Sequence, residues 1–136
     1  MGAPLYLDTS AVLRAVLESG TTPEIETRIG AAPALLTSRL ALVESARAVA
    51  RLRATGAATE TQLADVGRAL DAIWARCDVW EVDHAVCDLA AAAAPATSLR
   101  TLDALHLATY TLARRQLGGL ELLTTDDRLR AAAGGA

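Results

Sequence analysis

Four acidic side chains in this sequence have the types and positions expected of a site for a hard divalent cation. Asp8 and Asp126 each follow a short apolar run, Glu44 lies within LTSRLALVESARA, and Asp103 lies within RTLDALHLATY. Carboxylate oxygens are the ligands that Mg2+ and Mn2+ prefer, whereas zinc is bound mostly by cysteine and histidine. One or two such ions could lower the pKa of a bound water and stabilise the charge that develops when a phosphodiester is hydrolysed.

Each of the four acids also has a purely structural interpretation. Asp8 and Asp126 could cap the helices that follow them. Asp103 would lie in the first turn of a helix, where the helix dipole favours a carboxylate. Glu44 shares a helix face with two arginines and could form an ordinary surface ion pair.

The structural interpretation is weakest for Asp103. Its helix is apolar on nearly every side until Arg114, and a helix that is apolar all round is usually buried. A buried lone carboxylate is costly unless a cation compensates its charge. The sequence contains no lysine, so we expect a metal ion to provide that compensation.

Short apolar strands alternate with helices along the chain, which indicates one α/β domain, residues 1–136, with a parallel sheet covered on both faces. We expect strands at residues 5–7, 34–36, 78–82 and 120–123. We expect helices at residues 11–18, 23–29, 37–53, 59–76, 83–94 and 101–117 and from about 127, with a loop at 95–98. In open α/β sheets, ligands bind beyond the carboxyl ends of the strands, where Asp8 and Asp126 would meet. Glu44 and Asp103 lie in helices that could face the same crevice.

Composition excludes several other classes of protein. All thirteen basic residues are arginine, so neither a Walker A phosphate loop nor lysine Schiff-base chemistry is available. The net charge of −3 argues against a protein that coats nucleic acid through its overall field. No apolar segment approaches the roughly 20 residues that span a bilayer, and no signal peptide is evident, so we expect a cytoplasmic protein. Cys77 and Cys87 are predicted to be free packing residues.

Four segments, YLDTSA, LTSRLALVESARA, RTLDALHLATY and LLTTDDRL, occur in this order along the chain. Together they resemble the PIN domain, specifically the VapC-type toxins of bacterial toxin–antitoxin pairs, over essentially the whole chain. The resemblance implies a three-layer α/β/α sandwich with a central parallel sheet. It also implies a homodimeric toxin that cleaves RNA with Mg2+ or Mn2+ and is neutralised by a cognate antitoxin.

The resemblance assigns roles to the four acids by position. Asp8 matches the first metal-binding aspartate, Glu44 the helix glutamate, Asp103 the aspartate of the LDALH element and Asp126 the last acid. The implied catalytic set is these four, with Asp8, Asp103 and Asp126 as metal ligands. Asp127 is a second acid in the last motif, so either it or Asp126 could face the metal; Asp126 fits the family spacing better.

Other residues are assigned to supporting positions. Ser10 and Thr124 match the small hydroxyl residues that support the site. Arg39 and Arg100 lie just upstream of two of the acids and are candidate phosphate contacts, with solvated arginine as the alternative. His106 is interpreted as a hydrogen-bonded core histidine in preference to a metal ligand.

The sequence therefore predicts a metal-dependent endoribonuclease that hydrolyses RNA by in-line attack of a water molecule. A Mg2+-dependent phosphatase of the haloacid-dehalogenase type is one alternative. It generally needs a second aspartate where Ser10 stands and a lysine that the sequence lacks. The other alternative is a catalytically inactive PIN-like interaction module.

Overall fold

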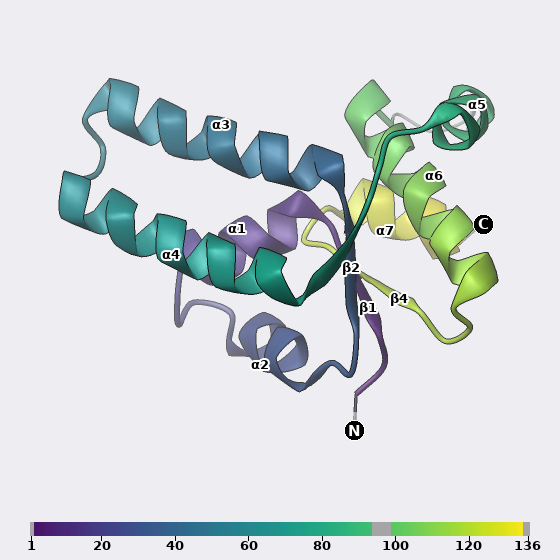
Figure 1. The fold of residues 1–136 in the computed structure, drawn as a ribbon, viewed down its shortest axis with the longest axis horizontal. Coiled ribbons are helices and arrows are strands. Elements are labelled where there is room, and N and C mark those ends of the chain that lie inside the picture. The colour runs from purple at the N-terminus through teal and green to yellow at the C-terminus, as the bar shows by residue number, and fades with distance from the viewer. Residues whose placement is uncertain (1, 94–98, 135–136) are drawn as a thin grey trace.

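A four-stranded parallel sheet forms the centre of the computed structural model, which describes residues 2–93 and 99–134 (Figure 1). The strand order is β3-β2-β1-β4. The strands are β1 (Leu5–Leu7), β2 (Leu35–Ser38), β3 (Cys77–Trp80) and β4 (Glu121–Leu123). Leu5 pairs with Leu35 on one side and with Glu121 on the other, so β1 is a central strand. The predicted loop at 95–98 lies outside the described residues.

Alternation along the strands sends side chains to two separate cores. Leu5, Leu7 and Leu35 face one cluster, whereas Tyr6 and Leu36 face the other. All three residues of β1 are buried, because helices cover both faces of this strand. The predicted three-layer α/β/α architecture is confirmed.

The helices divide between the two faces according to these clusters (Figure 1). The first face carries α1 (Thr9–Leu17), α2 (Pro23–Ala31), α3 (Arg39–Thr55) and α4 (Glu60–Arg76). The second carries α5 (His84–Ala92), α6 (Thr101–Gln116) and α7 (Asp127–Gly134). Local signals set several boundaries: Pro23 is at the first position of α2, Thr59 and Gln62 form a capping box at the start of α4, and Gly56 ends α3 with a φ of 67°.

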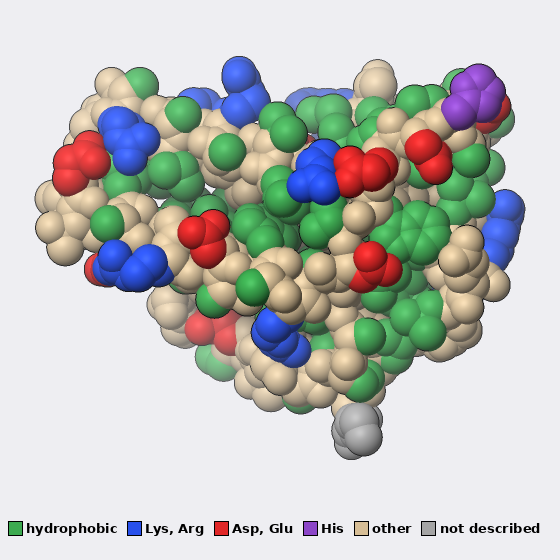
Figure 2. All heavy atoms as spheres, viewed as in Figure 1, with side chains coloured by type: hydrophobic (Ala, Val, Ile, Leu, Met, Phe, Trp, Pro, Cys, Tyr) green, Lys and Arg blue, Asp and Glu red, His purple; other side chains and the backbone are tan. Residues whose placement is uncertain are grey.

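The long helices α3 and α4 run side by side and leave an apolar groove between them. Its walls include Leu42 and Val49 of α3 and Leu70 and Trp74 of α4. Figure 2 shows hydrophobic side chains along this groove, with positive and negative side chains interspersed elsewhere on the same face. Within the described residues, no helix is long and apolar enough to cross a membrane.

The third strand, predicted at 78–82, is Cys77–Trp80, and the boundary between the second strand and the helix after it also differs from the prediction. Thr37 and Ser38 were expected to begin a helix, but they extend β2 and pair with Val79 and Trp80 of β3. The Thr37 hydroxyl donates a hydrogen bond to the carbonyl of Leu7 (2.8 Å), which ties this residue to β1. Tertiary pairing therefore overrides the local helix signal, and Ser38 becomes the N-cap of α3 by accepting a bond from the backbone N–H of Leu40.

The two cysteines differ from each other, and the prediction that both are packing residues holds for only one. Cys77 packs against the first core, whereas Cys87 is exposed on α5. Burial raises the pKa of the Cys77 thiol to about 11. At pH 8 only about one in a thousand Cys77 thiols is then ionised, and the thiolate is the reactive form.

We therefore expect native Cys87 to react with iodoacetamide about 100-fold faster than Cys77 at pH 8. Peptide mass spectrometry of timed samples would measure both rates. In denaturant the two rates should converge, and equal rates in the native protein would contradict the described packing of Cys77.

Candidate active site

The carboxyl ends of β1 and β4 form the point at which the chain connections diverge. After β1 the chain enters α1 on one face of the sheet, and after β4 it enters α7 on the opposite face. Such a switch point leaves a crevice beyond the strand ends. Asp8 follows β1 directly and Asp126 lies three residues after β4, so both acids lie at this crevice.

Asp8 is buried and held by two hydroxyl groups. Ser10 and Thr124 each donate a hydrogen bond to its Oδ2, at 2.6 and 2.8 Å. Backbone N–H groups of Thr125 and Asp126 donate to these same two hydroxyls, at 3.0 Å each, which leaves the hydroxyl protons directed at Asp8. Although Asp8 occupies the N-cap position of α1, its side chain makes no capping hydrogen bond. The capping interpretation therefore does not account for Asp8.

Asp126 does cap a helix, but with only one of its oxygens. Its Oδ1 accepts hydrogen bonds from the backbone N–H groups of Arg128 (2.9 Å) and Leu129 (3.3 Å) in α7. The neighbouring Asp127 points outward: its side chain is 92% exposed and pairs with Arg130. Of the two candidate acids, the structure places Asp126 beside Asp8, through Thr124, and Asp127 at the surface.

Glu44 reaches the same site from α3. Its Oε1 accepts a hydrogen bond from the Thr9 hydroxyl (2.7 Å) and lies 2.7 Å from Nε2 of His106. Burial acts to raise the pKa of Glu44, but the hydrogen bonds from His106 and Thr9 outweigh it, so the pKa is lowered. The acid is thus held ionised by partners far away in sequence, and not by the arginines on its own helix face.

His106 is buried on α6 and contacts three parts of the site. Its Nδ1 lies 2.8 Å from the hydroxyl oxygen of Tyr6, its Nε2 bonds Glu44, and the same Nε2 is 3.8 Å from Oδ1 of Asp8. The prediction of a hydrogen-bonded buried histidine is confirmed. The sequence did not reveal its partners.

Asp103 lies one turn before His106 at the start of α6. Burial raises its pKa most, followed by the negative charge of Asp126; the charge of Asp8 adds to the shift, while a backbone hydrogen bond at Arg100 and His106 oppose it. Like charges act this way only over short distances, so Asp103 shares the crevice with Asp8 and Asp126. All four predicted acids therefore gather at one end of the sheet.

Three of these carboxylates have the same arrangement of bonded and unbonded oxygens. Asp8 Oδ2, Glu44 Oε1 and Asp126 Oδ1 each accept two hydrogen bonds from protein donors. Within residues 2–93 and 99–134, the second oxygen of each accepts none. Hard oxygen donors beside mutually repelling charges fit a divalent cation such as Mg2+. In the same described ranges, no three His, Cys, Asp or Glu side chains already form a group that could hold an ion.

The candidate phosphate contacts Arg39 and Arg100 are both exposed. Arg39 forms a two-bond ion pair with Glu81, through Nε (3.1 Å) and Nη2 (2.6 Å). Arg100 precedes α6 at its N-cap position. In this structure Arg39 therefore lies in an exposed ion pair with Glu81.

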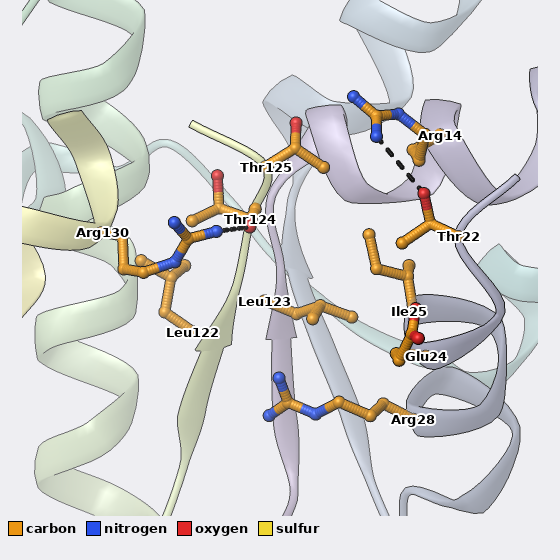
Figure 3. Close-up of a pocket in the computed structure, with 10 residues that line it drawn as sticks. All are labelled: Arg14, Thr22, Glu24, Ile25, Arg28, Leu122, Leu123, Thr124, Thr125 and Arg130. Atoms are coloured by element: carbon orange, nitrogen blue, oxygen red, sulfur yellow. Dashed lines mark hydrogen bonds between the residues drawn. The ribbon is translucent and has the colours of Figure 1, made fainter. Parts of the chain in front are cut away.

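A second group of arginines borders the site along β4 (Figure 3). Arg14, Arg28 and Arg130 surround a pocket of about 370 Å3 whose wall includes Thr124 and Thr125. Each arginine already pairs with an acid, and Arg130 also donates to the backbone carbonyl of Thr124 (2.6 Å). Arg130 thus helps to position Thr124, one of the two hydroxyl residues that support Asp8.

Sequence reasoning missed two members of the site, Thr9 and Tyr6. Thr9 lies beside Asp8 in YLDTSA, and Tyr6 lies in the buried strand before it, so nothing in their local pattern distinguished them from packing residues. The sequence signal was the three-residue spacing of Asp103 and His106, which places the two side chains on neighbouring sides of one helix. This spacing indicates that His106 lies near the crevice, but it does not identify Tyr6 and Thr9 as partners of His106.

The PIN domain model matches residues 5–135. Ribonuclease VapC35 from Mycobacterium tuberculosis is 33% identical over 131 residues, which cover 95% of this chain and 89% of that protein.

Solved structures share the fold at lower identity. PAE2754 from Pyrobaculum aerophilum superimposes with a TM-score of 0.68 at 21% identity, covering 98% of this chain and 82% of that chain. A toxin–antitoxin complex from Klebsiella pneumoniae superimposes with a TM-score of 0.62 at 20% identity, covering 90% of this chain and 86% of that chain. The family model and the 33% identical relative together establish that this chain belongs to the PIN domain family, as a relative of the VapC ribonucleases.

Proposed function

We propose that this protein is an endoribonuclease that uses Mg2+ or Mn2+ to hydrolyse RNA phosphodiester bonds. The observation that carries the proposal is the convergence of Asp8, Glu44, Asp103 and Asp126 at one crevice, where burial and the charges of Asp126 and Asp8 raise the pKa of Asp103. A polyanion such as RNA would be repelled from these carboxylates without a cation. The similarity to ribonuclease VapC35 supports RNA as the substrate.

The residues of the site would have different roles in the reaction. Asp8, Asp103 and Asp126 would bind the metal ion, each through a carboxylate oxygen directed into the crevice. When bound, the ion would supply an activated water and stabilise charge on the phosphate. Ser10 and Thr124 hold Asp8 in one orientation. Glu44 would accept hydrogen bonds from the attacking water and orient it towards the phosphorus atom.

We also propose that the protein is a toxin inhibited by a cognate antitoxin and that it acts as a homodimer. The similar structure from Klebsiella pneumoniae, which is a toxin–antitoxin complex, supports an antitoxin partner. The apolar groove between α3 and α4 offers a surface on which such a partner could bury side chains.

The decisive experiment is RNA cleavage by the purified protein at controlled metal concentration. We expect cleavage with Mg2+ or Mn2+, complete loss with excess EDTA and recovery when the metal is restored. Products should carry a 5′-phosphate. Release of phosphate from small esters without RNA cleavage would favour a phosphatase, and no cleavage of any RNA under these conditions would favour an inactive interaction module.

A further inference from the structure

A continuous line of buried side chains connects the central strand to Glu44. The Tyr6 hydroxyl lies 2.8 Å from Nδ1 of His106, and Nε2 of the same ring lies 2.7 Å from Oε1 of Glu44. Tyr6 is completely buried and His106 is 1% exposed, whereas the Glu44 side chain is 28% exposed. The line therefore runs from the interior of the protein to the edge of the crevice.

We propose that His106, oriented by Tyr6, is a positioning residue that fixes the Glu44 carboxylate for catalysis. The inference rests on the proposed nuclease function for its kinetic consequences. It assigns to His106 neither metal binding nor contact with RNA.

The hydrogen-bonding capacities of the groups give the line a direction. An ionised carboxylate can only accept, so Nε2 of His106 must carry the proton that it shares with Glu44. In the neutral ring Nδ1 accepts the proton of the Tyr6 hydroxyl, and in the protonated ring Nδ1–H donates to the Tyr6 oxygen; in both forms Nε2–H donates to Glu44. This assignment satisfies every polar atom along the line. It also places a proton where Nε2 would need a lone pair to bind a metal, which is why the ring is not assigned as a ligand.

Packing prevents the ring from leaving this orientation. Tyr6 contacts His106 edge-on, with ring centroids 6.0 Å apart, and contacts Tyr110 on its other side at 5.9 Å. Tyr6 belongs to β1, which is hydrogen-bonded to strands on both sides. The position of Glu44 is thereby tied to the sheet, although its own helix leaves the side chain partly exposed.

Fixing Oε1 determines where the other oxygen of Glu44 points. Thr9 and His106 occupy Oε1, and Oε2 is the atom left for a water or a cation in the crevice. A glutamate has three rotatable side-chain bonds, so without these two donors it would adopt several rotamers. Loss of one donor should reduce the fraction of molecules in the competent arrangement without changing contacts with RNA.

The first test compares two buried tyrosines. Tyr6→Phe keeps the ring and removes the hydroxyl that orients His106. We expect kcat to fall about 10-fold, as is typical when a partner behind a site residue is removed, with KM for RNA unchanged. Tyr110→Phe is the matched control, because its hydroxyl donates to the carbonyl of Leu120 (3.2 Å) away from the acids. It should leave kcat unchanged. Wild-type kcat in Tyr6→Phe, or an equal loss in both variants, would overturn the proposal.

The second test asks whether the proton donor to Glu44 matters, as opposed to the volume of the ring. The amide nitrogen of glutamine in His106→Gln can reach the position of Nε2, whereas the shorter amide in His106→Asn reaches only that of Nδ1. We expect His106→Gln to retain at least about 10-fold more kcat than His106→Asn at similar melting temperature. Equal losses in the two variants would contradict a positioning role.

A third measurement is independent of activity. Nitrogen-15 NMR of the wild-type protein without metal or RNA should show that Nε2 of His106 carries a proton. A predominant Nδ1–H tautomer would contradict the inference independently of any activity measurement, because Nε2 would then have no proton to donate to Glu44. If instead the tautomer is as expected but wild-type protein cleaves no RNA, the proposed function fails while the geometry of the line stands.

Discussion

Asp8→Asn is expected to lower kcat/KM for RNA at least about 1,000-fold while leaving the fold intact. The magnitude corresponds to losing about 4 kcal/mol of stabilisation in the transition state, in the range that a bound metal ion supplies. Ser10 and Thr124 both donate to Oδ2 of Asp8, so in the variant they should select the carbonyl oxygen of asparagine. The amide NH2 then takes the place of the free oxygen and directs two protons at the cation.

Two further measurements separate this chemical effect from misfolding. Removing one of several neighbouring negative charges relieves repulsion, so metal-free Asp8→Asn should melt at or above the temperature of the wild type. Asp83→Asn is the matched control, because Asp83, like Asp8, is the N-cap residue of a helix that follows a strand, and its side chain accepts a bond from the backbone N–H of Val86 (2.9 Å). Asparagine caps as well as aspartate, so this control should cleave RNA normally. If Asp8→Asn kept a tenth or more of the wild-type kcat/KM for RNA, the assignment of Asp8 as a metal ligand would be wrong.

The sequence predicted the ends of β1 and β4 correctly because these two ends depend on local signals. The apolar run before Asp8 and the switch from strand to helix after it are both visible in six residues, and the parallel sheet then places Asp8 near Asp126. The extension of β2 through Thr37 and Ser38 was not visible in this way. It depends on pairing with β3 and on the carbonyl of Leu7, which are brought together only by the fold.

Asp103 was selected by an argument that the structure corrects. The helix was expected to be buried on all sides, but Leu102 is 46% exposed and Asp103 is half-buried, because the first turn of α6 extends past the core that covers Leu107 and Tyr110. The need for a compensating cation comes from burial together with the charges of Asp126 and Asp8. The pattern of residues along one helix cannot reveal charges that lie on other parts of the chain.

The hydrogen-bond partners of Glu44 could not be predicted from the sequence of its own helix either. Its helix face suggested an ion pair with arginines a turn or two away, but its partners are Thr9 and His106, the latter 62 positions along the chain. Pairing over such a separation is a product of topology, since α3 and α6 lie on opposite faces of the sheet and their side chains meet beyond the carboxyl end of β1. The order of the motifs selected Glu44, and the structure shows how its carboxylate is held.

The adjacent acids Asp126 and Asp127 give the second large effect that we expect, and they act as controls for each other. Asp126→Asn should lower kcat about 100-fold or more and raise the Mg2+ concentration needed for half-maximal cleavage, because it removes a charge from the crevice. Its melting temperature should change little, since asparagine can still accept the capping bonds from Arg128 and Leu129.

Asp127→Asn should remain within about threefold of wild type, because it removes only an exposed ion pair with Arg130, and such pairs contribute little. Parallel titrations of the two variants with Mg2+ would make the comparison. Loss confined to Asp127→Asn would reverse our assignment of the last metal ligand, and equal losses would mean that both carboxylates act on the ion. In either case α7 would have to begin differently in the active enzyme, because in this structure the two side chains point in different directions and only Asp126 is linked through Thr124 to Asp8.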